Sequence, residues 1–373
     1  MPQPRRILHI ISDLSVGGAE MVLCNLLSEL DREKWQPAVI SLMDKGPLRE
    51  RIEALGIPVY SPRMKSGLPS PAAWWRFLRI VREFQPDLLQ GWMYHSNLAA
   101  TLARFALRLN APVVWSVHYT VASLKRERRL TAFVIKLCAL LSSRADHIIF
   151  VSRTSQAQHA ALGYDIAKSC VLPNGINVRE FQPSAEARRA VRVELNAPLD
   201  APLFGNIGRF HPMKDHANFL RAAALIARQL PDAHFLLAGR GVDNENLALR
   251  QLMTELHLGE RVHLLGERRD IPRLAAALDV FASASAFGES FPNIIGEAMA
   301  CGVPCVVTDV GDCAWLVGAT GAVVSPRDAA ALANQCLAAL QLSPSPDARA
   351  RVCENFALET VAAQYAELYE ALP

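Results

Sequence analysis

Several features that would assign this chain to other protein classes are missing from its 373 residues. The eight cysteines include no Cys-x2-Cys pair, and most lie in apolar stretches, as expected of small buried side chains in a reducing compartment. The apolar run after Arg5 and Arg6 is too short for the core of a signal peptide. The longest hydrophobic helix candidate, Leu130–Leu141, contains Lys136 and is too short to span a bilayer. We therefore expect a cytoplasmic protein that is not an integral membrane protein.

Other absences narrow the enzyme classes. No G-x-G-x-x-G follows the first expected strand, which argues against a nicotinamide-dependent oxidoreductase. No low-complexity tract and no sequence repeat occurs. Because 51% of the residues are hydrophobic and 20% are charged, the chain can bury large cores, and its length suits two or three domains.

Charge is unevenly distributed along the chain. Residues 1–180 hold 23 Lys and Arg against 14 Asp and Glu, whereas residues 181–373 hold 16 against 22. The two halves therefore differ in sign, +9 against −6. Such a split indicates that the basic half meets an anionic partner, unless it is a chance distribution over two solvated surfaces.

Short apolar runs alternate with helical patterns throughout the chain. Arg6–Ile11 is expected to be a strand and Ala19–Leu30 a helix, and this alternation continues as far as Cys170–Leu172. Turn-forming residues then interrupt it at Leu172–Pro183, and a new series begins with the strand Pro202–Gly208. The pattern predicts two doubly wound α/β domains with parallel sheets.

Three segments carry candidate chemistry, because in such sheets ligands bind beyond the carboxyl ends of the strands. Gly17 and Gly18 precede the first helix, where the backbone could approach an anion or a sugar hydroxyl, although a simple strand–helix turn would also use them. Arg209 and Lys214 follow the first strand of the second half and could neutralise phosphate, unless they are solvated surface cations.

The third segment, Phe287–Gly302, is the most specific. Pro292 suits a first helical turn and Gly302 suits a helix C-terminus. A helix is expected to start at Ser290, Phe291, Pro292 and Asn293. Its free backbone N–H groups, which Pro292 lacks, could hold a phosphate. Glu289 and Glu297 then border one pocket, where each could accept hydrogen bonds from a pair of hydroxyls.

These motifs together resemble the family 4 retaining glycosyltransferases of the GT-B fold. The Glu-x7-Glu signature is matched by Glu289 and Glu297, and the GGAE loop, the LPNGIN junction and GRFHPMKD match in order. The resemblance implies two Rossmann-like domains facing each other across a cleft. They would comprise residues 1–180 with about 357–373, whose final helix crosses back, and residues 181–356.

The resemblance also implies roles for these residues. Arg209 and Lys214 would neutralise the donor diphosphate, Glu289 would bind the transferred sugar and Glu297 the ribose. His118 would lie near the transferred sugar and the acceptor. Gly17 and Gly18 would approach the donor. Arg240 replaces the small residue of a G-x-G turn, and backbone near Leu264 would contact the base, with uridine favoured over guanosine.

Retention of anomeric configuration implies front-face departure and attack, with no protein nucleophile. No Asp-x-Asp triplet occurs, so we expect no metal and no cofactor beyond the nucleotide-sugar co-substrate. Domain closure about Asn174–Phe181 would exclude water from the reacting sugar. The alternatives are a GT-B relative with epimerase or phosphorylase chemistry and a non-catalytic glycosyltransferase-like subunit.

The acceptor is expected on the basic half. Tyr94 and His95 follow a strand and would help line its cleft. The basic run of Lys125, Arg126, Arg128 and Arg129 precedes an apolar helix, a pattern that suits an anionic membrane surface or, alternatively, a solvated charge run. The resemblance to relatives that build bacterial surface glycans implies a glycan or lipid-linked acceptor in cell-surface polysaccharide synthesis. No nucleic acid partner is expected.

Overall fold

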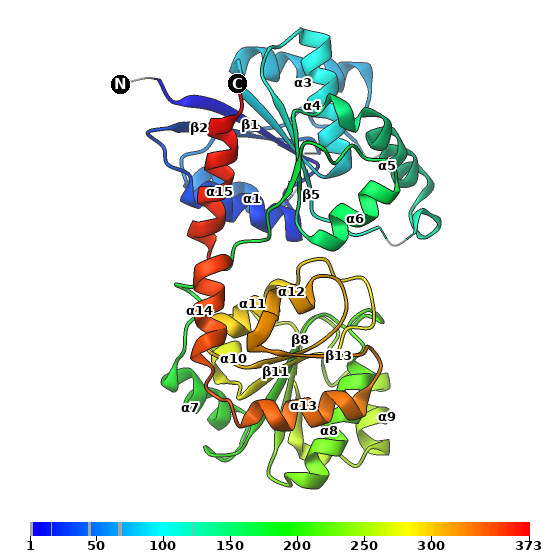
Figure 1. Cartoon of the computed structure of the whole chain (residues 1–373), viewed down its shortest axis with the longest axis vertical. Helices are drawn as coiled ribbons and strands as arrows, with labels where there is room; N and C mark the ends of the chain where they lie inside the picture. The colour runs from blue at the N-terminus through cyan, green and yellow to red at the C-terminus, as the bar shows by residue number, and fades with distance from the viewer. Residues whose placement is uncertain (1–2, 16, 44–45, 66–68, 122) are drawn as a thin grey trace. The chain divides into compact units, whose positions relative to one another are not determined.

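The computed structural model describes the chain except for residues 1–2, 16, 44–45, 66–68 and 122. The chain divides into two compact units, the first comprising Met1–Gly175 with Leu358–Pro373 and the second comprising Ile176–Ala357. Each unit is built on its own parallel sheet with helices on both faces (Figure 1). The prediction of two Rossmann-like units is confirmed.

The sheet of the first unit has seven strands in the order β3-β2-β1-β4-β5-β6-β7. Its central strands β4 and β5 are buried along their whole length because both faces of a parallel sheet are covered. The order reverses between β1 and β4, so the carboxyl ends of these two strands flank a topological switch point. The strands are β1 (Arg5–Ile11), β2 (Trp35–Ser41), β3 (Val59–Tyr60), β4 (Leu88–Trp92), β5 (Val113–Val117), β6 (His147–Phe150) and β7 (Ser169–Val171).

Two hydrophobic cores lie on opposite faces of this sheet. One is formed with α3, α4 and α5, and the other with α1, α2 and the C-terminal helix α15, which packs against α1 (Figure 1). The helices are α1 (Gly18–Glu29), α2 (Leu48–Ala54), α3 (Pro71–Phe84), α4 (Met93–Leu107), α5 (Arg129–Leu141), α6 (Arg153–Ala161) and α15 (Leu358–Ala371).

Helix α15 is anchored to the first sheet by two fully buried tyrosines. Tyr365 stacks on Trp92, and the hydroxyl of Tyr369 donates to the side-chain oxygen of Gln90. Gln90 in turn donates to the hydroxyl of Ser116 at 2.7 Å. The final helix therefore completes the core of the first unit, although it follows the second unit in the chain.

The second sheet repeats the arrangement in the order β10-β9-β8-β11-β12-β13, with its switch point between β8 and β11. Its strands are β8 (Leu203–Ile207), β9 (His234–Ala238), β10 (Val262–Leu264), β11 (Val280–Ser283), β12 (Cys305–Thr308) and β13 (Ala322–Val324). Its helices are α7 (Ala185–Glu194), α8 (His216–Gln229), α9 (Leu247–Glu255), α10 (Ile271–Ala277), α11 (Asn293–Ala300), α12 (Cys313–Val317), α13 (Ala329–Leu340) and α14 (Pro346–Asn355). No helix in the described ranges of either unit is both long and apolar enough to cross a membrane.

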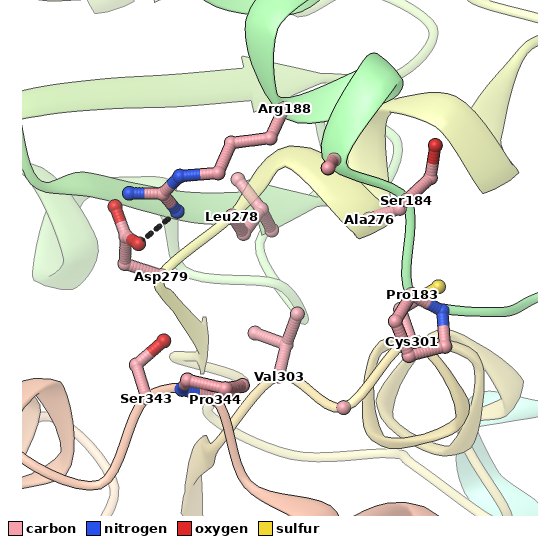
Figure 2. Close-up of a pocket in the computed structure, with 12 residues that line it drawn as sticks. Pro183, Ser184, Arg188, Ala276, Leu278, Asp279, Cys301, Val303, Ser343 and Pro344 are labelled. Atoms are coloured by element: carbon pink, nitrogen blue, oxygen red, sulfur yellow. Dashed lines mark hydrogen bonds and ion pairs between the residues drawn. The ribbon is translucent and has the colours of Figure 1, made fainter. Parts of the chain in front are cut away.

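A buried ion-pair cluster closes the amino edge of the second sheet. Asp279 accepts hydrogen bonds from Arg192 at 2.7 Å and from the backbone N–H of Leu203 at 2.8 Å, and it also pairs with Arg188. Arg188 and Asp279 line a hollow of about 260 Å³ at this edge (Figure 2). The cluster joins α7 to the first residues of β8 and β11, which is a structural role far from the strands' carboxyl ends.

We expect Asp279→Ala to destabilise the protein by about 3–5 kcal/mol, because it leaves the fully buried guanidinium of Arg192 without its counter-charge. Urea unfolding measures the change, with the exposed Asp232→Ala as the matched control. An Asp279→Ala variant as stable as this control would contradict the structural role of the cluster.

Candidate active site

The carboxyl edge of the second sheet gathers the charged residues that the sequence analysis singled out. The segment Gly208–Asp215 follows β8, and the segment 284–292 follows β11, the neighbouring strand across the switch point. Connections that leave adjacent strands in opposite directions open a crevice between them, which is where ligands bind in open α/β sheets.

Lys214 and Glu289 meet in this crevice. The ammonium of Lys214 lies 2.6 Å from Oε1 of Glu289, and the hydroxyl of Ser285 donates to the same oxygen, also at 2.6 Å. The carboxylate is 7% exposed, and Oε2 has no hydrogen bond with any residue in the described part of the chain. The pair therefore presents the Oε2 oxygen of Glu289 next to the ammonium of Lys214.

Backbone contacts hold the loops around this pair. The N–H of Ala286 donates to the carbonyl of Met213 at 2.8 Å, which joins the β8 and β11 loops directly. Thr308 donates to the carbonyl of Ser285 at 2.6 Å. Gly311 has φ +60° and packs so closely that a Cβ would lie 2.3 Å from the carbonyl oxygen of Glu289. A side chain at Gly311 would displace the Glu289 backbone.

Arg209 and Arg240 lie beside a second feature of the same edge, an open hollow of about 370 Å³. The N–H of Phe210 donates to the carbonyl of Arg240 at 2.8 Å, so the loops after β8 and β9 form one wall. Phe210 is exposed, and the other lining residues are Gly241, Asp243, Glu245 and Asn246. The aromatic face suits a flat ligand, and the lining offers two guanidinium groups to an anion beside two carboxylates.

Glu297 lies on α11, the helix that follows the Glu289 loop. Burial raises the pKa of its carboxyl group to about 7, and the neighbouring carboxylate of Glu180 adds to the rise. No hydrogen bond to this carboxylate occurs among the residues that the structure describes. The Glu297 carboxylate can therefore accept hydrogen bonds from a ligand, and burial destabilises its ionised form.

One expectation for this region needs correction, and the Phe291 side chain has a structural role. Pro292 is the residue before α11, in extended conformation, and not within its first turn. Phe291 is 5% exposed and packs against Trp315 and Phe356, so its side chain belongs to an aromatic cluster. Ser290 and Asn293 flank these two residues and both have partners within the protein.

The contact expected near Leu264 is one of the backbone, and its side chain lies elsewhere. Its side chain is 8% exposed and belongs to the hydrophobic core of the second unit, because β10 lies against α9 and the neighbouring strand β9. Contact with a ligand at this position is limited to the backbone.

In the first unit, the turn with Gly17 and Gly18 leads into α1. Neither glycine has a positive φ, which removes the explanation that the turn alone requires them. A Cβ at Gly17 would lie 2.3 Å from the Glu20 carboxylate, whereas one at Gly18 would meet nothing within 4 Å. Gly18 therefore leaves open space at the helix N-terminus.

His118 is half-buried at the carboxyl end of β5. Its ring stacks on Trp92 with centroids 5.1 Å apart. Burial lowers the pKa of His118 to about 4, a shift that the side chain of Asn174 partly opposes. The imidazole is consequently neutral at pH 7 and can both donate and accept a hydrogen bond.

Tyr94 and His95, the two residues expected to line an acceptor cleft, differ in burial. Tyr94 is 2% exposed, and its hydroxyl is hydrogen-bonded to His159 at 2.8 Å. The prediction that Tyr94 faces a ligand is wrong, because α4 turns this side chain into the core. His95, one residue on, is exposed.

Of the basic run, Lys125, Arg128 and Arg129 are exposed at the start of α5. The side chain of Arg126 lies outside the described residues.

Sequence reasoning missed two residues of the site. Ser285 positions the Glu289 carboxylate, and Glu180 raises the pKa of Glu297. The signal for Ser285 was its place two residues after β11 and four residues before Glu289.

Comparisons with known proteins show the family of the chain. The family model described as Glycosyltransferase Family 4 matches residues 16–180, and the model described as Glycosyl transferases group 1 matches residues 201–342. The chain is 29% identical to the lipopolysaccharide core biosynthesis mannosyltransferase LpsB of Rhizobium meliloti, over 86% of this chain and 90% of that protein.

Two further comparisons concern a ligand and an acceptor. An Escherichia coli enzyme, UDP-Gal:alpha-D-GlcNAc-diphosphoundecaprenol alpha-1,3-galactosyltransferase, is 28% identical over 58% of this chain and 57% of that protein. The crystal structure of Anabaena HepE in complex with UDP superposes with a TM-score of 0.85 at 26% identity, covering 98% of this chain and 100% of HepE. The chain belongs to the family 4 glycosyltransferases of the GT-B fold.

Proposed function

We propose that this glycosyltransferase moves a hexose or N-acetylhexosamine from a UDP-sugar to a glycan or lipid-linked acceptor, with retention of anomeric configuration, in cell-surface polysaccharide synthesis at the cytoplasmic face of the membrane. The observation that carries the proposal is the Lys214–Glu289 pair at the switch point of the second sheet, beside the hollow lined by Arg209 and Arg240.

The chemistry follows from where these groups lie. When the bond from the anomeric carbon to the diphosphate breaks, its electron pair remains on the phosphate. Lys214 and Arg209 would stabilise that growing charge, which is the term that lowers a barrier most. Glu289 Oε2 would accept hydrogen bonds from the sugar hydroxyls, and Glu297 would accept them from the ribose.

Retention would arise from attack on the face that the leaving group vacates. The acceptor oxygen forms its bond to the anomeric carbon, and the acceptor proton passes to the departing phosphate oxygen. Neutral His118 would donate to or accept from a sugar hydroxyl without contributing charge. We propose no metal and no other cofactor, because the two cations would balance the diphosphate.

The donor and acceptor classes draw on the relatives. HepE has been solved with UDP and with UDP-glucose, and the Escherichia coli relative is named for UDP-Gal and a diphosphoundecaprenol-linked acceptor. LpsB is named for lipopolysaccharide core biosynthesis. These names favour uridine over guanosine and a lipid-linked or glycan acceptor.

Acceptor-dependent release of UDP tests the proposal. UDP-galactose, UDP-glucose and GDP-mannose are each incubated with and without GlcNAc-diphosphoundecaprenol, with a chelator present in a parallel series. Release that requires the acceptor, with an α-linkage in the product by NMR, supports a retaining transferase. Conversion of one nucleotide sugar into another without acceptor would indicate an epimerase. Formation of a sugar phosphate from a glycan and inorganic phosphate would indicate a phosphorylase. Absence of nucleotide binding would indicate a non-catalytic subunit.

We expect Lys214→Ala to lower kcat by about 10²–10³, because Lys214 opposes charge that grows only in the transition state. Steady-state kinetics with the preferred donor measure this loss. The control is Arg221→Ala, which removes an exposed cation from α8 of the same unit. A change confined to KM would mean that Lys214 binds the donor and its transition state equally.

Glu297→Gln is expected to stabilise the donor-free protein above pH 7 and to have little effect below pH 4.5. The folded-state pKa is raised from 4.5 to about 7, so the native protein loses stability as pH rises through this window. The neutral amide avoids that loss, with a gain on the order of 1–3 kcal/mol. Thermal unfolding at both ends of the window measures it.

The same variant should bind UDP more weakly than the wild type. Ribose hydroxyls donate more strongly to a carboxylate than to an amide, so wild-type affinity should rise with pH through about 7 while that of the variant stays flat. Glu180→Gln is the matched control, because it removes the neighbouring charge and leaves the ribose ligand in place. A stable variant with unchanged UDP affinity would contradict the ribose role.

A further inference from the structure

One outer surface of the first unit combines exposed apolar side chains with an excess of cations. Helices α3, α4 and α5 pack in sequence over one face of the sheet, with α4 between the other two (Figure 1). We call their solvent-facing side the outer helical face. Its exposed large apolar residues are Trp75, Leu102, Phe105, Leu130, Phe133 and Leu140.

Helix α5 contributes the most apolar part of this face. Its inner side chains, Val134, Ile135 and Cys138, are buried in the core. Phe133 and Leu140 lie on the outer side and are 62% and 80% exposed. A surface helix normally carries polar residues opposite its buried stripe, so an apolar stripe on both sides indicates a second apolar contact.

Charge on this face is predominantly positive. Residues 71–144, from the start of α3 to the turn after α5, hold 11 Lys and Arg but only three Asp and Glu. Glu83 pairs with Arg79, and Arg104 pairs with Asp146 just beyond this range. Asp87 and Glu127 accept hydrogen bonds from neutral donors, and the remaining cations outnumber these two acids. The unpaired excess on this face is therefore positive.

Cations and apolar side chains are interleaved. The guanidinium of Arg79 lies 5.6 Å from the Trp75 ring centroid, and that of Arg144 lies 6.0 Å from the Phe105 centroid. Lys136 is exposed on α5 between Phe133 and Leu140. Apolar groups that can enter a headgroup layer, with cations beside them, match the pattern of proteins that lie on an anionic bilayer.

We propose that the outer helical face docks the enzyme on an anionic membrane surface, with Phe133 and Leu140 of α5 inserted among the lipid headgroups. A second copy of this chain is a poorer occupant, because a twofold interface would place this positive surface against itself. Docking would hold the enzyme on the membrane that contains a lipid-linked acceptor if the proposed acceptor is correct, but docking itself requires neither donor nor transfer.

Vesicle co-sedimentation of the full chain, without substrates, tests the proposal. One set of vesicles contains phosphatidylcholine alone, and the other contains phosphatidylcholine mixed with phosphatidylglycerol. We expect binding only to the mixed vesicles, weakening as salt screens the charges. Reversing the charge at Lys125, Arg126, Arg128 and Arg129 to Glu should weaken partitioning by at least about fivefold for each residue that faces the lipid.

A second variant separates insertion from charge. Leu130/Phe133/Leu140→Ser keeps every cation and should weaken partitioning by about tenfold or more, because the apolar area no longer leaves water. The matched controls alter the second unit, Arg221/Arg228/Arg250→Glu for charge and Val193/Leu247/Leu342→Ser for exposed apolar residues. Unchanged thermal unfolding of each variant verifies that it is folded.

Three outcomes would overturn the proposal: equal sedimentation of the variants and their controls, no sedimentation with mixed vesicles at low salt, or a dimer in solution that the Leu130/Phe133/Leu140→Ser variant dissociates. The last would assign the face to a second copy. UDP binding measured on the same samples tests the donor site separately, so failure of docking leaves the transferase assignment standing.

Discussion

The structure depends on one constraint, the parallel direction of its strands. Because every strand must be followed by a crossover helix, all carboxyl ends in a sheet lie at the same edge. The order of the second sheet then reverses between β8 and β11, which brings the loop of Lys214 against the loop of Glu289. Two residues 75 positions apart in the chain form a 2.6 Å ion pair for this reason.

The two edges of the second sheet differ in whether their buried carboxylates have hydrogen-bond partners. At the amino edge, Asp279 has a partner for each oxygen, and Arg192 is fully buried against it. At the carboxyl edge, Glu297 is left without a hydrogen bond among the described residues, and its carboxyl pKa is raised to about 7. Charge satisfied within the protein stabilises a fold, whereas charge left unsatisfied is available to a ligand and costs stability until one binds.

The sequence predicted the elements with strong periodicity and missed those without it. His147–Phe150 and His234–Ala238 are apolar runs that could be assigned as strands from the residues alone. Helix α7 was missed because Ala185–Glu194 is rich in Arg and Glu and buries little apolar surface. Its position is determined by the contact of Arg192 and Arg188 with Asp279, some 90 residues away, which no local pattern reveals.

For the site, the sequence predicts which residues follow a strand but not which way their side chains face. Glu289, Lys214 and Arg209 could be singled out because they follow strands, where chemistry concentrates. Tyr94 follows a strand too, yet α4 begins directly at Met93 and rotates Tyr94 inward to His159. Whether a residue after a strand faces a ligand or the core depends on where the next helix starts, and a one-residue shift separates buried Tyr94 from exposed His95.

The membership of α15 in the first unit has a consequence for synthesis on the ribosome. Tyr365 and Tyr369 complete the core around Gln90 and Trp92, but they emerge only after the whole second unit, Ile176–Ala357, has been made. At elongation rates of roughly 5–20 residues per second, the first unit must wait on the order of ten seconds or more with part of one face of its sheet uncovered. The second unit is contiguous in sequence and can fold during that interval, so the half of the protein that is made first is finished last.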